Sequence, residues 1–140
     1  MDMVTPTSRQ LRAERWFQIT VLIGAVTNTL LSILGLLFPD ATLGVLGLSE
    51  VYPNLWVRFS CVLLLLLTLF YLPGALFVRQ YVICAILHIV SRFTGVLFFL
   101  TMVVVLKYSP KFLALGAYDL VFGLPSAIFL LRAFNVKAKD

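Results

Sequence analysis

Four apolar stretches, each close to the length of a membrane-spanning helix, dominate this sequence. A helix needs about 20 apolar residues to cross a bilayer, because the hydrocarbon core is about 30 Å thick and a helix rises about 1.5 Å per residue. Within that core every backbone polar group needs an internal partner, which favours helices. The predicted helices cover residues 16–38, 54–77, 81–106 and 112–131. We therefore predict an all-α polytopic membrane protein whose four transmembrane helices form an antiparallel bundle.

The composition agrees with a membrane protein. Of the 140 residues, 61% are hydrophobic and only 12% are charged, and the mean hydropathy is +1.04. Soluble domains carry about 25% charged residues. The formal net charge of +5 does not indicate a nucleic-acid partner, because the basic residues are scattered at the ends of the predicted helices. Their placement favours contact with a lipid bilayer that has anionic headgroups.

The distribution of basic residues predicts an orientation. A basic arm (1–15) and a tail (133–140) flank the predicted bundle (16–132), and both would lie on the same side of the membrane. The basic residues on that side are Arg9, Arg12, Arg15, Arg79, Arg132, Lys137 and Lys139. Lys107 and Lys111 lie on the other side and oppose the trend. The positive-inside rule then predicts a multi-pass protein of the inner or plasma membrane, with both termini in the cytoplasm. Residues 39–53 are too short and too rich in glycine to span, and we expect a re-entrant or interfacial segment there.

Two opposite charges fall at nearly the same predicted depth. Arg92 lies about eleven residues, or roughly 16 Å, into the third helix from the cytoplasmic side, and Asp119 lies roughly 11 Å into the fourth from the outside. A charge near the middle of a bilayer costs about 2.5–3.5 kcal/mol on insertion scales. We therefore predict that Arg92 and Asp119 pair inside the bundle. The pair is either a packing feature or part of a site that binds or moves something.

Other polar groups accompany this pair, and together they are the candidate ligand-binding residues. Asn28 lies near the middle of the first helix and is expected to form an interhelical hydrogen bond. Arg58 is shallower and either extends outward as an interfacial anchor or adds a positive charge to a pocket. His88 is either a hydrogen-bonded packing residue or a proton carrier, ligand contact or haem ligand. Tyr118 flanks the aspartate. The candidate set is Asn28, Arg58, His88, Arg92, Tyr118 and Asp119.

The sequence offers little for catalysis or metal binding. It has one histidine, two separated cysteines (Cys61 and Cys84) and no Cys-x-x-Cys motif. No Ser-His-Asp set at a suitable spacing, His-Glu-x-x-His motif or glycine-rich phosphate loop is present. We assign no catalytic or metal-ligating residue and expect no cofactor of the protein's own, apart from a bound quinone or lipid. An enzyme is the least favoured class.

Several segments together resemble a known family. They are GLLFPDATLGVLGL (35–48), WVRF (56–59), LFYLPGA (69–75) and YDLVFGLPSAIFL (118–130). Over residues 20–132 the chain resembles small bacterial four-helix membrane proteins, the DoxX-like family. That family takes its name from a subunit of a membrane quinol oxidase. The resemblance implies a four-helix bundle that associates with a redox complex, and it transfers no catalytic residue.

Three functions are compatible with these features. The first expectation is a non-catalytic accessory subunit of a larger membrane complex, of the electron-transfer type, that packs against partner transmembrane helices. The second is a bundle that binds a quinone or lipid, with Arg92, His88 and Tyr118 as donors and Asp119 orienting the arginine. The third is a small homo-oligomeric transporter. The expected partners are therefore the bilayer and either other membrane subunits or further copies of this chain.

Overall fold

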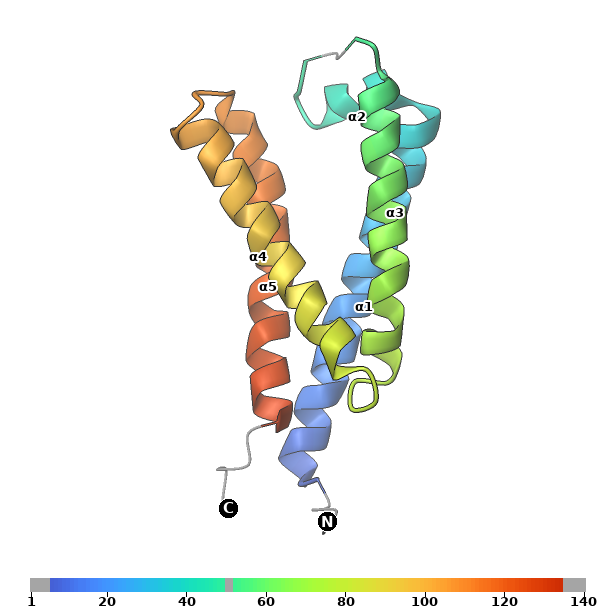
Figure 1. The fold of residues 1–140 in the computed structure, drawn as a ribbon, viewed down its shortest axis with the longest axis vertical. Helices are drawn as coiled ribbons and strands as arrows, with labels where there is room; N and C mark the ends of the chain where they lie inside the picture. Colours follow the sequence, from blue (N-terminus) through green and yellow to red (C-terminus); the bar gives the residue numbers. More distant parts are fainter. Residues whose placement is uncertain (1–5, 50–51, 135–140) are drawn as a thin grey trace.

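The computed structural model describes residues 6–49 and 52–134, and its long elements are all helices. Their order is α1 (Ser8–Leu37), α2 (Pro39–Val45), α3 (Leu55–Leu76), α4 (Val82–Val104), the 3-10 helix η1 (Pro110–Phe112) and α5 (Leu113–Phe134). Within the described residues, 4 helical segments are long and apolar enough to cross a membrane. Figure 1 shows that consecutive long helices run in opposite directions. The predicted all-α antiparallel bundle of membrane-spanning length is confirmed.

The first long helix begins well before the predicted start at residue 16. Thr7 and Gln10 form a capping box: the Thr7 side chain accepts a hydrogen bond from the Gln10 backbone N–H, and the Gln10 side chain accepts one from the Thr7 N–H. This exchange satisfies backbone donors that a helix start leaves unpaired, so helix forms from Ser8 onward. Residues 8–15 of the predicted arm therefore belong to α1. Two parts of the predicted flanking segments lie outside the described residues: 1–5 of the arm and 135–140 of the tail.

The segment after α1 contains a short helix of its own. Pro39 begins α2, where its missing N–H costs nothing, and Pro39 and Leu43 are buried. Gly47 follows with a φ of 68°, a conformation that glycine adopts without strain. A Cβ atom at Gly47 would lie 3.4 Å from the Lys111 side chain, so this loop reaches η1, which comes just before α5. With only 7 residues, α2 is too short to span a membrane.

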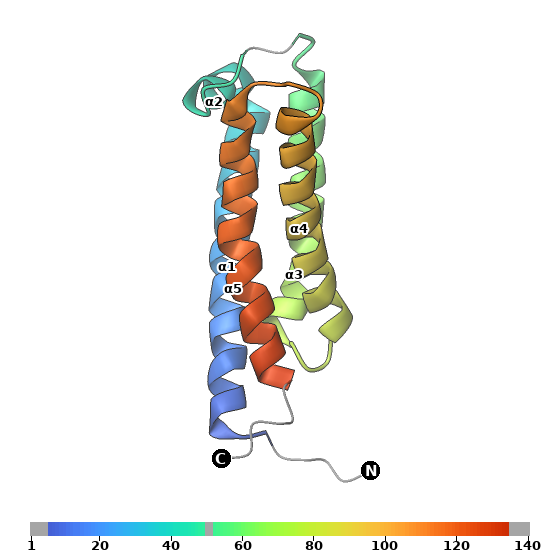
Figure 2. The same cartoon turned by 90° about the vertical axis from the view of Figure 1, so that its left-hand side faces the viewer.

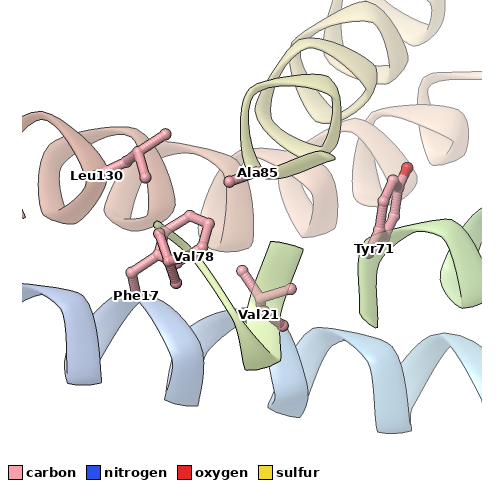
Figure 3. Packing of buried hydrophobic residues seen from close by; sticks show 7 residues of the cluster. Phe17, Val21, Tyr71, Val78, Ala85 and Leu130 are labelled. Atoms are coloured by element: carbon pink, nitrogen blue, oxygen red, sulfur yellow. The ribbon is translucent and has the colours of Figure 1, made fainter. Parts of the chain in front are cut away.

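The bundle has a packed end and an open end. We call the end where α1 begins and α5 ends the terminal end, and the opposite end the α2 end. A buried apolar cluster lies toward the terminal end and draws on every long helix (Figure 3): Phe17, Val21, Tyr71, Ala75, Val78, Ala85 and Leu130. From there the α1/α3 pair and the α4/α5 pair diverge toward the α2 end (Figure 1). Seen at right angles, α5 lies over α1 and α4 over α3 (Figure 2).

Candidate ligand-binding site

An ion pair joins the middle of α4 to the first half of α5. Arg92 Nη1 donates to Asp119 Oδ1 at 2.7 Å. The arginine side chain is 4% exposed and the aspartate side chain 18%, so neither is freely solvated. The pairing predicted from the depths of the two residues is confirmed. Because both charges are removed from water, each depends on the other for compensation.

Glycines make room for both charged side chains. A Cβ atom at Gly95 would collide with the Asp119 carboxylate, and one at Gly123 would lie 2.9 Å from Arg92 Cβ. A Cβ atom at Gly24 on α1 would lie 3.2 Å from Arg92 Nη2. Small residues allow helices to approach closely in lipid. Here the side chains of Arg92 and Asp119 occupy the space that a Cβ atom at these glycines would need.

The Arg92 guanidinium still has unused hydrogen-bond donors. Its Nε and Nη2 are buried without a hydrogen-bond partner. Its Cζ lies 5.4 Å from the centre of the Tyr118 ring and 5.7 Å from that of the Phe122 ring. Cation–π contact of this kind stabilises the charge but does not satisfy the N–H groups. The guanidinium is therefore held in place by Asp119 and two aromatic rings, with Nε and Nη2 enclosed by protein.

A hydrogen-bond network beside the ion pair joins α5 to α1 and α3. The Tyr118 hydroxyl donates to Asn28 Oδ1 at 2.8 Å and lies 2.6 Å from Thr27 Oγ1. Asn28 Nδ2 donates to Thr68 Oγ1 at 3.4 Å. The interhelical hydrogen bond expected for Asn28 is confirmed. Sequence reasoning missed both threonines, although Thr68 is the one serine or threonine in the apolar run from 62 to 72 and could have drawn attention.

These polar groups form the floor of a cavity that occupies the α2 half of the bundle. The cavity has a volume of about 410 Å³, and Asn28, Arg92, Tyr118 and Asp119 all line it. Its walls are mostly apolar and come from every α-helix, with Leu31, Leu43, Leu64, Phe99 and Leu115 as examples. We call it the central cavity. An apolar chamber of a few hundred Å³ with a few convergent polar groups is typical of a small-molecule site.

Two of the predicted site residues lie elsewhere. His88 does not line the central cavity. Its ring packs edge-on against that of Tyr71 with 4.5 Å between centroids, and the Tyr71 hydroxyl hydrogen-bonds to Ser91. The histidine is 1% exposed and both ring nitrogens lack a hydrogen-bond partner. His88 therefore faces the packed half of the bundle, because α4 turns this part of its face toward α3.

Arg58 is exposed near the α2 end. Its Nη1 donates to the Leu36 carbonyl oxygen at 2.6 Å, in the last turn of α1. A cation at a helix C-terminus neutralises carbonyls that lack partners. Of the two alternatives for Arg58, the outward placement is the one observed, and the residue does not line the central cavity.

Metal binding has no support in the described part of the chain, where no cluster of three or more His, Cys, Asp or Glu side chains could hold an ion. Comparison with protein-family models, with curated proteins and with solved structures finds no match for this chain. The resemblance to the DoxX-like family stays a prediction. What the site can bind is therefore inferred from its geometry.

Replacing Tyr118 by phenylalanine tests the polar network. The change leaves the buried Asn28 oxygen without its donor, and we expect the free energy of unfolding to fall by about 1–2 kcal/mol. Thermal unfolding in mild detergent measures the loss. Tyr108→Phe is the control, because Tyr108 is exposed in the turn before α5 and should change stability by less than about 0.5 kcal/mol. Equal effects of the two substitutions would contradict a structural role for the hydroxyl of Tyr118.

Proposed function

We propose that this bundle binds a small amphipathic molecule, a quinone or a lipid, in the central cavity. The acceptor group of its head lies against the polar floor formed by Arg92, Asp119 and Tyr118, and its apolar part occupies the chamber between the helix pairs. The observation that carries the proposal is the polar floor of Arg92, Asp119, Tyr118 and Asn28 at the bottom of an otherwise apolar cavity. A hydrogen bond to a charged group contributes about 1.5–3 kcal/mol, so a ligand acceptor beside this floor is stabilising.

The charge balance of the floor favours a neutral head. Asp119 already compensates Arg92 at 2.7 Å. An anionic head would leave an uncompensated negative charge in a site of low polarity, which is costly. A carbonyl oxygen accepts from the guanidinium without adding charge. Quinone carbonyls and the ester carbonyls of lipids share this chemistry.

We extend the proposal to how the ligand enters and how the bundle is oriented in the membrane. The cavity lies in the half of the bundle that includes α2, on the side opposite the terminal end. Five arginines near the terminal end support a cytoplasmic location for both termini, in the inner or plasma membrane: Arg9, Arg12, Arg15, Arg79 and Arg132. On this orientation the cavity lies in the outer half of the bilayer, where an amphipathic molecule enters laterally from lipid.

The test uses the purified full chain in mild detergent with a short-chain alkyl benzoquinone as probe. We expect the wild-type protein to bind it, and the variant Arg92→Leu/Asp119→Leu to bind at least about ten-fold more weakly, because a hydrogen bond from a charged donor contributes about 1.5–3 kcal/mol. Removing both charges together avoids an unpaired buried charge, so the variant is expected to fold. Mass spectrometry of the gently extracted protein shows in parallel whether a quinone or a lipid is retained.

A pair of tryptophan substitutions on α5 separates cavity binding from adsorption to the lipid-facing surface. Leu115→Trp fills part of the cavity, whereas Leu124→Trp places the same ring on an exposed position that does not line it. The proposal expects lost binding in the first variant and unchanged binding in the second. Wild-type affinity in Leu115→Trp and in the double leucine variant would refute it.

The accessory-subunit role stays a prediction, and so does the homo-oligomeric transporter. Both are compatible with a ligand in the central cavity. Recovery of stable partner subunits with the protein in mild detergent would support the first role. Flux in proteoliposomes would support the second.

A further inference from the structure

A second groove lies at the terminal end, far from the central cavity. It runs between the first turns of α1 and the last turns of α5 and has a volume of about 400 Å³. Arg9 and Arg12 line it from α1, and Arg132 lines it from α5. We call it the terminal groove. It shares no lining residue with the central cavity.

The terminal groove is positively charged. No acidic residue lines it, and Arg12 and Arg132 form no ion pair within the described residues. Glu14, the acidic residue nearby on α1, is already paired with Arg79 at 2.8 Å. Arg12 and Arg132 are both exposed, so their guanidinium groups can reach a ligand. The carbonyls at the end of α5 help to orient a cation such as Arg132 but cannot cancel its charge.

An aromatic pair borders the groove on the side of the membrane core. Trp16 and Phe129 stack with 6.3 Å between ring centroids and an interplanar angle of 25°, and Trp16 is half exposed. Tryptophan side chains favour the level of the lipid headgroups. The guanidinium groups therefore lie on the water side and the aromatic rings on the lipid side of one groove. This order matches a phospholipid, whose phosphate lies outside its glycerol and acyl chains.

We propose that the terminal groove binds the phosphodiester of an anionic phospholipid, with Arg12 and Arg132 clamping the phosphate between α1 and α5. Guanidinium groups match phosphate oxygens with paired hydrogen bonds. A lipid with a net negative charge balances the surplus of arginines better than a zwitterionic one. Bound there, the lipid would tie the first helix to the last. The proposal is independent of quinone binding, which depends on the other end of the bundle.

The test is titration of the full chain in mild detergent with dioleoyl phosphatidylglycerol or dioleoyl phosphatidylcholine, read by native mass spectrometry. We expect a preference for phosphatidylglycerol in the wild type and about thirty-fold weaker binding in Arg12→Gln/Arg132→Gln, because each arginine next to an anionic lipid contributes roughly a five-fold factor. Both substitutions are at exposed positions, so folding is expected to be unaffected.

Arg15→Gln is the matched control, because Arg15 has the same charge on the same helix but does not line the groove. Arg12→Gln alone should weaken phosphatidylglycerol binding about five-fold, whereas Arg15→Gln should leave it unchanged. Equal binding of the two lipids by the wild type would overturn the proposal. Equal losses in Arg12→Gln and Arg15→Gln would also overturn it, since they would indicate diffuse surface charge. Displacement of the lipid by millimolar inorganic phosphate would show a free-anion site instead.

Discussion

Replacing Asp119 by alanine is expected to lower the free energy of unfolding by about 3–5 kcal/mol. The carboxylate compensates Arg92, whose side chain is 4% exposed and whose remaining donors already lack partners. Without Asp119, a positive charge stays buried between α4 and α5 with only two aromatic rings beside it. Thermal or denaturant unfolding in mild detergent, followed by circular dichroism, measures the loss.

Two controls make this prediction specific. Glu14→Ala also removes the acidic half of an arginine ion pair, but Arg79 is 42% exposed, so the cost should be at most about 1 kcal/mol. The variant Arg92→Leu/Asp119→Leu should be more stable than Asp119→Ala, because no charge is left alone. Similar costs for Asp119→Ala and Glu14→Ala would show that the pair between α4 and α5 is solvated, contrary to its burial.

Replacing Gly74 by alanine is expected to cost about 3 kcal/mol, the upper part of the usual range for overpacking. A Cβ atom there would lie 2.6 Å from the backbone nitrogen of Ala85 and 2.8 Å from the carbonyl carbon of Cys84. These are main-chain atoms of α4, which cannot rotate away as a side chain can. The substitution therefore forces α3 and α4 apart beside the apolar cluster, and the unfolding temperature should fall.

Gly44→Ala is the control for this substitution. Gly44 lies in α2, and a Cβ atom there meets no atom of the described residues within 4 Å. Alanine favours helix over glycine by about 0.8–1.0 kcal/mol, so Gly44→Ala should be neutral or slightly stabilising. A neutral result for Gly74→Ala would mean that α3 and α4 do not approach each other as closely as the structure places them.

The central cavity follows from the uneven packing of the bundle. Close contact at Gly74 and the apolar cluster around Phe17 hold the helices together toward the terminal end. Divergence toward the α2 end leaves the central cavity, whose floor is the ion pair. Weakening the packed half is therefore expected to disturb the cavity, whereas changes to the cavity walls should leave the packed half intact. Leu115→Trp changes the cavity wall and Gly74→Ala changes the packed half. Ligand binding and the unfolding temperature, measured for both variants, test this expectation.

The sequence by itself determined the helices and the depths of their polar groups. Both are local properties: an apolar stretch of sufficient length has to be helical in lipid, and the rise per residue converts position into depth. This is why the pairing of Arg92 with Asp119 could be predicted from one chain. The start of α1 was missed, because the Thr7–Gln10 capping box extends the helix into a polar segment.

Only the tertiary structure decided which way each helix faces and where the helices separate. In a membrane, residues facing lipid and residues facing other helices are equally apolar, so hydropathy carries no signal for rotation about the helix axis. His88 therefore packs against Tyr71 and Arg58 reaches the Leu36 carbonyl, although both were among the candidate ligand-binding residues. The hydrogen bond between Asn28 and Thr68 likewise depends on which faces α1 and α3 turn toward each other. The cavity exists because close contacts between α3 and α4 hold one end of the bundle together while the other end opens.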